Sequence, residues 1–293
     1  MTRAGFVVLA GRPNVGKSTL VNTVVGEKVA IVSDRPQTTR RAIRGVHRSA
    51  DVEVVLVDLP GVQRPRDALT ARMARRVQQE LEGSDAALLL LGGDQGVGGG
   101  DRFIARTLAE AQLPVVVAVN KVDRLSRAAL LAALQQAAEL EAGDEVFPIS
   151  ARTGEGVPEL IAHLATLLPE GPFMYSSDAV TDQPLQQLVA ELVREAAVRR
   201  TFQEVPHAVE VLVEELDRPR EDLVRVQASV WVETESQKGI LIGSGGRMIK
   251  AIGIAARREL ERALACHVHL ELSVRVRRDW RADEGLLDRL GIN

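Results

Sequence analysis

A strand, a glycine-rich loop and a helix can be read at the start of the chain. The loop has the sequence GRPNVGKS (residues 11–18); it follows the apolar run 6–10, which predicts a buried parallel strand, and precedes 19–25, which can continue as a helix. In this setting the spacing G-x-x-x-x-G-K-[ST] is typical of a phosphate-binding loop. Its backbone N–H groups can point at one anion beside the positive end of a helix. The loop therefore predicts a phosphate site, without specifying which nucleotide.

Strands and helices continue to alternate through the first half of the chain. The predicted strands are 52–57, 86–91, 114–119 and 145–149, and the predicted helices are 70–81, 101–111, 127–140 and 156–167. This alternation is typical of an α/β domain with a mostly parallel, doubly wound sheet. Ligands of such sheets bind beyond the carboxyl ends of the strands, where each motif below is found.

Three oxygen-bearing side chains are predicted to hold Mg²⁺. They are Ser18 of the loop, Asp58 at the end of a predicted strand, and Thr39 in the polar segment 32–41, with Thr38 as the alternative to Thr39. Hydroxyl and carboxylate oxygens suit this hard cation. Asp58 begins an Asp-x-x-Gly turn, which is common in proteins but, in this order after the loop, indicates a metal site.

The phosphates themselves are predicted to contact Lys17 and the backbone of Gly61. Lys17 would reach the terminal phosphates, and the N–H of Gly61 would sense the last of them. With Thr39, these residues form the predicted catalytic set.

The sequence Asn120-Lys121-Val122-Asp123 predicts that the base is guanine. A carboxylate at Asp123 can accept two parallel hydrogen bonds from guanine, whereas adenine offers no such donor pair. Asn120 would tie this segment to the phosphate loop, the stem of Lys121 would cover the base, and a backbone N–H at Ser150 or Ala151 would meet the guanine oxygen. The full predicted nucleotide-binding set is Gly11, Arg12, Pro13, Asn14, Val15, Gly16, Lys17, Ser18, Thr19, Asp58, Leu59, Pro60, Gly61, Asn120, Lys121, Asp123, Ser150 and Ala151. The glycine-rich run 92–100 lacks a lysine and the strand–helix spacing, and we interpret it as a flexible connection.

The motif series GRPNVGKST, QTTRR, DLPG, NKVD and ISA resembles the GTPase domain of the translation-factor-related bacterial GTPases, and within them the Era family. The resemblance implies GTP hydrolysis with Mg²⁺, and it implies that Asn14 helps bind a potassium ion where one is used. Two departures are Leu59, where threonine is usual, and Val62, where small Ras-like GTPases carry the glutamine that orients water. Because no side-chain amide orients water at Val62, we expect slow intrinsic turnover, at or below the ~10⁻⁴ s⁻¹ scale of unassisted Ras.

The join between the two halves is predicted where two prolines and a glycine interrupt the chain at 168–172. We assign residues 1–170 to the GTPase domain, 171–177 to a linker and 178–293 to a second domain. In the second domain, helical spacing predicts helices at 184–200 and 247–264, and alternation predicts strands at 207–216, 223–233 and 267–276. A turn is predicted at 218–220 and a short apolar turn at 239–242.

The order α-β-β-α-α-β, with Gly243-Ser244-Gly245-Gly246 between two helices, resembles an α+β type II KH domain over residues 184–278. In that resemblance the two outer glycines let the backbone of single-stranded RNA approach. Ile242, Ile249 and Ile252 would form an apolar floor for the bases. The predicted RNA-binding residues are Ile242, Gly243, Ser244, Gly245, Gly246, Arg247, Ile249 and Lys250. Family members often carry lysine inside this loop, and here Arg247 and Lys250 are the candidates to supply its charge.

Charge supports an RNA contact beside this loop. Residues 238–281 hold ten lysines and arginines against four acids, a net charge of +6, whereas residues 204–235 hold nine acids and three arginines, a net charge of −6. A basic segment suits a phosphate backbone, although ion pairing on a solvated helix is the alternative interpretation.

Over nearly the whole chain the resemblance is to the Era family. It implies a ribosome-biogenesis GTPase that binds the single-stranded 3′ end of small-subunit ribosomal RNA and assists maturation of the small ribosomal subunit. We expect a monomer in the cytoplasm, where the single Cys266 suits a reducing compartment. The resemblance also implies association with the inner face of the cell membrane, which we expect to be peripheral because no apolar run approaches the ~20 residues of a span. Two alternatives stay open: an RNA-binding module with a structural nucleotide site, and a modification or transport GTPase.

Overall fold

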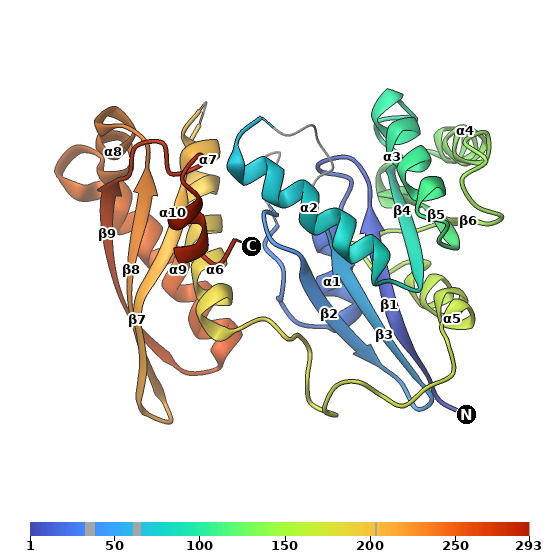
Figure 1. Ribbon diagram of the computed structural model, residues 1–293, viewed down its shortest axis with the longest axis horizontal. Helices are drawn as coiled ribbons and strands as arrows, with labels where there is room; N and C mark the ends of the chain where they lie inside the picture. Colours follow the sequence, from blue (N-terminus) through green and yellow to red (C-terminus); the bar gives the residue numbers. More distant parts are fainter. Residues whose placement is uncertain (33–38, 61–65, 203, 293) are drawn as a thin grey trace. The chain divides into compact units, whose positions relative to one another are not determined.

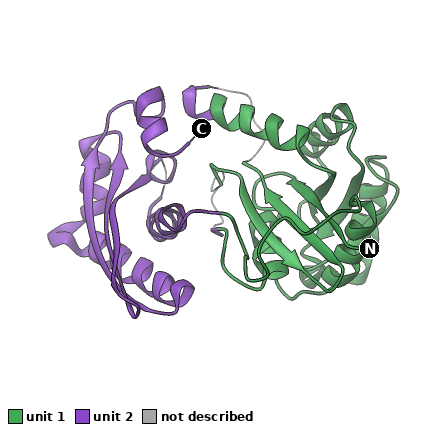
Figure 2. Cartoon of the chain, turned by 60° about the horizontal axis from the view of Figure 1, so that its bottom comes forward, with its two compact units in different colours: residues 1–30, 39–65, 71–182 green, residues 31–38, 66–70, 183–293 purple. Residues whose placement is uncertain are grey.

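The computed structural model describes residues 1–32, 39–60, 66–202 and 204–292. The chain divides into two compact units (Figure 2). Unit 1 comprises the described residues within 1–30, 39–65 and 71–182, and unit 2 those within 31–38, 66–70 and 183–293. Each unit has its own sheet.

Unit 1 contains a six-stranded sheet of strand order β2-β3-β1-β4-β5-β6 (Figure 1). Its strands are β1 (Arg3–Ala10), β2 (Ile43–Arg48), β3 (Val52–Asp58), β4 (Ala86–Gly92), β5 (Val115–Asn120) and β6 (Val146–Pro148). The helices that alternate with them are α1 (Lys17–Val25), α2 (Ala68–Glu82, which belongs to unit 1 from Ala71 on), α3 (Gly99–Glu110), the 3₁₀ turn η1 (Val122–Arg124), α4 (Arg127–Ala138) and α5 (Val157–Leu167).

All pairs in this sheet are parallel except β2 with β3, which confirms the predicted mostly parallel, doubly wound fold. Strand β2 is not among the predicted strands, because its sequence IRGVHR has little apolar alternation. Strand β1 pairs with β3 on one side and β4 on the other. The chain therefore reverses its winding direction at β1, and the loop after β1 lies at the switch point, where ligands of such sheets bind.

Alternate residues of β1 enter two separate cores. Val7 and Leu9 pack in a cluster with residues of α1 and α5, whereas Val8 and Ala10 pack with residues of α2, α3 and α4. All four side chains are at most 3% exposed. Since side chains alternate between the faces of a strand, α1 and α5 cover one face of the sheet and α2–α4 cover the other.

The segment that leaves α5 is attached to unit 1 as far as Asp182. The Gly171 N–H donates to Thr2 O at 3.1 Å, and the Val46 N–H on β2 donates to Val180 O at 2.9 Å. Glu53 on β3, which is fully buried, accepts hydrogen bonds from the Arg48 side chain and, at 2.6 Å, from the Met174 N–H. We call residues 171–182 the strap.

Because the strap hydrogen-bonds to Glu53, a substitution at Glu53 should affect the stability of unit 1. We expect Glu53→Gln to lower the free energy of unfolding of unit 1 by about 2 kcal/mol, because a buried, charge-assisted set of hydrogen bonds loses its charge. That corresponds to a fall in Tm of about 5 °C for a domain of this size, measurable by circular dichroism. Asp51→Asn, at an exposed turn on the same hairpin, is the control and should change Tm by less than about 1 °C. Equal Tm values for the two variants would contradict the role assigned to Glu53.

Unit 2 contains a three-stranded sheet of order β7-β8-β9, in which β7 and β8 are antiparallel and β8 and β9 are parallel. Its elements are α6 (Leu185–Arg200), α7 (Val205–Ala208), β7 (Glu210–Arg220), β8 (Leu223–Val232), α8 (Glu235–Ile242), the 3₁₀ turn η2 (Ser244–Gly246), α9 (Arg247–Leu264), β9 (His267–Val276) and α10 (Glu284–Arg289). Residues of α6 and α9 pack in one apolar core with β8. The predicted α-β-β-α-α-β order is confirmed, with α7 and α10 added.

One prediction in unit 2 is wrong and another is incomplete. The turn predicted at 218–220 lies inside β7, which continues to Arg220 through an irregularity in register. Pro219 is tolerated there because β7 is an edge strand. The turn predicted at 239–242 is the end of helix α8, which begins at a capping box: the Gln237 N–H donates to Thr234 Oγ1 at 3.2 Å, and the Gln237 side chain accepts from the Thr234 N–H at 3.2 Å.

The stretch Glu235–Leu264 has the length and mean hydropathy of a membrane span. It is not one straight helix, because Gly245, with φ 60° and ψ 26°, separates α8 from α9. Within unit 2 this stretch is the helix pair that crosses between the parallel strands β8 and β9.

Candidate functional site

The loop between β1 and α1 folds around the side chain of Lys17. Lys17 is 9% exposed, and its Nζ donates to the carbonyl oxygens of Gly11 at 3.0 Å and Arg12 at 3.2 Å. Pro13 and Asn14 at the tip of the loop are exposed. The lysine predicted to reach the phosphates is therefore held against its own loop at the start of an α-helix.

The structure brings together the three predicted metal ligands. Ser18 Oγ donates to Asp58 Oδ2 at 2.5 Å, Thr39 Oγ1 donates to the same oxygen at 3.3 Å, and the two hydroxyl oxygens lie 3.4 Å apart. Asp58 is fully buried, and its Oδ1 makes no hydrogen bond within the part of the chain that the structure describes. Clustered hydroxyl and carboxylate oxygens, with one carboxylate oxygen unsatisfied, fit the ligand preference of Mg²⁺.

Burial shifts the pKa values of both charged groups here toward their neutral forms. Desolvation lowers the pKa of Lys17, and the charge of Asp58 opposes that shift only in part. Desolvation raises the pKa of Asp58, against the charge of Lys17 and the hydrogen bonds from Ser18 and Thr39. A bound phosphate would favour the charged lysine, and a bound cation would favour the charged carboxylate. Both perturbed groups are thus matched to a metal–polyphosphate ligand.

Asn120, at the end of β5, connects the loop after that strand to the phosphate loop. Its Nδ2 donates to Val15 O at 2.7 Å, and its Oδ1 accepts from the N–H groups of Lys121 at 2.7 Å and Ala151 at 2.8 Å. The predicted link between the two loops is present. Ala151 is joined in turn to α1, because Thr23 Oγ1 donates to Ala151 O at 2.5 Å.

Asp123 carries the carboxylate that is predicted to accept hydrogen bonds from guanine. Ser150 Oγ donates to its Oδ1 at 2.6 Å, and the guanidinium of Arg152 contacts its Oδ2 at 2.6 Å. The Ser150 hydrogen bond, followed by Arg152, lowers the pKa of Asp123, so the group is an acceptor at neutral pH. Lys121 lies nearby with its Nζ 3.1 Å from both carboxylate oxygens of Asp94.

Two parts of the predicted site are not placed. Gly61 and Val62, and the alternative ligand Thr38, lie outside the described residues. Leu59 and Pro60, which directly follow Asp58, are buried. Val15 is also buried in the core of unit 1, whereas Thr19 is half-buried.

In unit 2 the glycine-rich loop makes a close turn into the long helix α9. Gly243 has φ 69°, and a Cβ atom there would lie 2.8 Å from Met248 Cβ and 3.0 Å from Met248 N, so only glycine fits. Ser244, Gly245 and Arg247 are exposed, and Gly246 is half-buried. Among the described residues no side chain caps the first turn of α9, whose backbone N–H groups therefore suit a phosphate.

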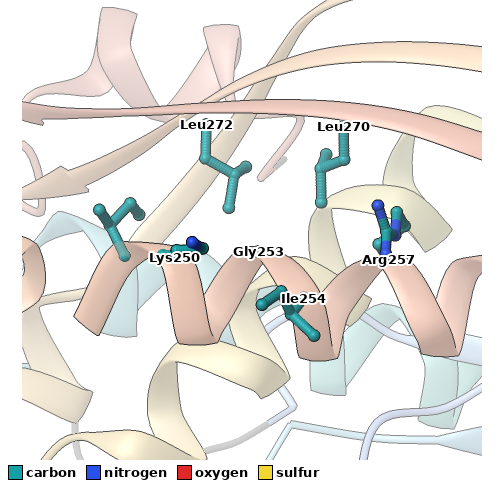
Figure 3. Close-up of a pocket in the computed structure, with 7 residues that line it drawn as sticks. Lys250, Gly253, Ile254, Arg257, Leu270 and Leu272 are labelled. Atoms are coloured by element: carbon teal, nitrogen blue, oxygen red, sulfur yellow. The ribbon is translucent and has the colours of Figure 1, made fainter. Parts of the chain in front are cut away.

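A pocket of about 300 Å³ lies between α9 and β9 beside this loop (Figure 3). Leu270 and Leu272 on β9 point toward α9, which presents Lys250, Gly253, Ile254 and Arg257. Ile249 completes the lining. The pocket is thus apolar along its walls and carries two cations.

The residues predicted to contact RNA lie differently with respect to this pocket. Ile249 and Lys250 line it, whereas Ile252 is fully buried in the core of unit 2. Ile242, in the last turn of α8, is half-buried and does not line it. Ile254 and Arg257, which also line the pocket, were not among the predicted residues, although they follow Lys250 by four and seven residues and so share its helix face.

Comparisons with known proteins cover both units. A family model described as 50S ribosome-binding GTPase matches residues 6–121, and one described as KH domain matches residues 204–281. The chain is 43% identical to GTPase Era of Lactobacillus helveticus over 289 residues, with 99% of this chain and 96% of that protein covered. It is 44% identical to GTPase Era of Mycobacterium tuberculosis over 294 residues, with 98% of each covered.

Two solved structures are similar over nearly the full length. One is Era in complex with MgGDPNP and nucleotides 1506–1542 of 16S ribosomal RNA, with a TM-score of 0.94, 33% identity, and coverage of 100% of this chain and 99% of that one. The other is a single-substitution variant of Aquifex aeolicus Era bound to GDP and AlF₄⁻, with the same TM-score and identity and 99% of each chain covered.

Proposed function

Because the chain belongs to the Era family of GTPases, we propose that its GTP hydrolysis controls binding to the 3′ end of small-subunit ribosomal RNA during assembly of the small subunit. The GTPase activity belongs to unit 1. The RNA contact is assigned to the pocket and glycine-rich loop of unit 2.

Six side chains of the nucleotide site would act in binding or hydrolysis. Lys17 would leave its two carbonyl partners for the phosphates, and backbone N–H groups of the loop would surround them. Asp123 would accept the hydrogen bonds of guanine, and Asn120 keeps that loop in register with the phosphate loop. When bound by Ser18, Thr39 and Asp58, Mg²⁺ would neutralise charge on the phosphate oxygens. Thr39, whose hydroxyl lies 3.3 Å from Asp58 Oδ2, would complete the coordination of Mg²⁺ when a γ-phosphate is present.

The pocket of unit 2 is the observation that carries the RNA assignment. Bases need an apolar surface, and Ile249, Ile254, Leu270 and Leu272 supply it. Phosphates need cations and backbone N–H groups, which Lys250, Arg257 and the start of α9 supply. None of the described residues that line the pocket is aromatic, so bases would pack on aliphatic groups. The Era complex with nucleotides 1506–1542 of 16S ribosomal RNA supports the same choice of RNA.

The coupling can be tested by measuring RNA affinity in two nucleotide states. With an RNA of the 16S 3′ end, we expect at least about a fivefold difference in Kd between the protein loaded with a non-hydrolysable GTP analogue and with GDP, the lower limit of usual allosteric coupling. A scrambled RNA of equal length is the control.

The other outcomes identify the alternatives. Equal RNA affinity in both states would indicate an RNA-binding module with a structural nucleotide site. Hydrolysis without any RNA binding would indicate a modification or transport GTPase.

The proposal has four finer features. They are potassium binding at Asn14, slow intrinsic turnover caused by Val62, a monomeric state, and a cytoplasmic location with peripheral association at the membrane. Phosphate release in potassium and in sodium buffers would test the first of them.

A further inference from the structure

The loop between β4 and α3 receives the side chain of Arg12. Arg12 Nε lies 2.9 Å from Asp101 Oδ2 and 3.0 Å from Asp101 Oδ1, and its Nη2 donates to Gly96 O at 2.7 Å. Asp101, in the first turn of α3, is 0% exposed and also accepts from the Gly98 N–H at 2.8 Å. Arg12 belongs to the phosphate loop, yet its side chain is held by a segment far along the chain. This segment is the glycine-rich run 92–100, predicted to be a flexible connection, together with Asp101.

The run packs closely against the Arg12 side chain. A Cβ atom at Gly100 would lie only 3.0 Å from Arg12 Cδ, so a side chain there would crowd the arginine stem, whereas one at Gly98 would lie in ordinary contact, 3.5 Å from Arg12 Nη1. The run is held elsewhere too, because the Val97 N–H donates to Gln136 Oε1 at 3.2 Å and the Gly93 N–H donates to Asn120 O at 2.9 Å. The run therefore receives the Arg12 side chain through Gly96 O and the close packing at Gly100.

The same arginine also touches the catalytic lysine. Arg12 O accepts a hydrogen bond from Lys17 Nζ at 3.2 Å, while the Arg12 side chain is fixed by Asp101. A buried carboxylate that is paired and hydrogen-bonded holds its partner in one geometry, because leaving either charge unpaired is costly. The ion pair with Asp101 on α3 therefore holds the first half of the phosphate loop, around Arg12, in place.

We propose that Asp101 is a positioning residue for GTP binding, which fixes the phosphate loop through the side chain of Arg12. Asp101 does not touch the nucleotide itself. By holding the loop in one conformation, Asp101 reduces the conformational entropy that the loop loses when phosphate binds. Loss of the Asp101 carboxylate should therefore weaken nucleotide binding more than it slows the hydrolysis step. The proposal concerns unit 1 alone and is independent of the RNA assignment.

The test compares Arg12→Ala, Asp101→Asn and the double variant Arg12→Gln/Asp101→Asn in the full-length protein. For the single variants we expect the Kd of fluorescent GDP and the KM for GTP to rise about tenfold. This is the lower end of the loss seen when a residue that orients a ligand-binding group is removed. We expect kcat to stay within about twofold of the unmodified protein. The double variant removes both charges, so it should fold even if a single variant does not, and its Kd should rise by the same factor rather than by the product of two.

Two further measurements separate positioning from general stability. Arg12→Lys can keep one of the two contacts and should recover part of the lost affinity. Arg102→Ala, which removes an exposed arginine from the same turn of α3, should leave Kd, KM and Tm unchanged. Unchanged Kd in the double variant would overturn the proposal, as would equal losses in kcat and in nucleotide affinity.

Discussion

Replacing Asp123 with asparagine is expected to lower the affinity for GTP by about a thousandfold and to create affinity for xanthosine triphosphate. A site built to pair with specific donors discriminates by factors of this size when one partner is changed. An asparagine amide would place an N–H group against the guanine amine, whereas it would complement the carbonyl oxygen that xanthine has at that position. The Ser150 hydroxyl can still donate to the asparagine oxygen, and the Arg152 guanidinium, which loses its partner, is exposed and can turn to solvent, so the loop should keep its shape.

This result can be measured by competition with fluorescent GDP and by phosphate release from both triphosphates. Asp144→Asn, at an exposed aspartate before β6, is a control of equal chemistry. An Asp123→Asn protein that still prefers GTP over the xanthine nucleotide would show that the base is read by other groups.

Placing two negative charges in the loop before α9 is expected to lower RNA affinity about a hundredfold at low salt. Ser244 and Gly245 are both exposed, and a Cβ atom at Gly245 would meet nothing within 4 Å. Aspartate and asparagine both tolerate the positive φ of Gly245, so the variant Ser244→Asp/Gly245→Asp should fold. Its charges would repel the phosphate backbone that the loop is proposed to hold.

The matched control is Ser244→Asn/Gly245→Asn, which has the same shape without the charge. We expect it to bind RNA within about threefold of the unmodified protein, and we expect the gap between the two variants to shrink as salt is raised. Hydrolysis of GTP without RNA should be unchanged in both. If the aspartate and asparagine variants bind RNA equally, the loop is not the phosphate contact. Gly243 is unsuitable for this test because a side chain there would collide with Met248.

The sequence predicts those parts of the site whose residues stand at fixed spacings within short motifs. Asp58 and Asn120 each end a strand, and Ser18 lies at the start of α1, after the loop that leaves β1. Because parallel strands bring their carboxyl ends to one edge, the convergence of these residues follows from the order of elements. Glycine loops between a strand and a helix, or between two helices, are likewise local patterns.

The features that escaped prediction depend on partners that are remote in sequence. Strand β2 is defined by its pairing with β3 rather than by its own apolar pattern. Pro219 indicates a turn in isolation and is permitted in a strand only by its place at the sheet edge. The ion pair of Arg12 with Asp101 joins positions with no periodic relation, and only the folded chain reveals it.

The strap, residues 171–182, decides where a fragment that contains only the GTPase half should end. Strand β2 is an edge of its sheet, and an uncovered edge is a template for pairing with a second molecule. The hydrogen bond from Val46 to Val180 covers part of that edge, and Val180 also packs on the core of unit 1. A fragment that stops at Glu170 would expose the edge and leave Glu53 without its Met174 partner. A soluble, monomeric preparation of the GTPase half should therefore end after Asp182.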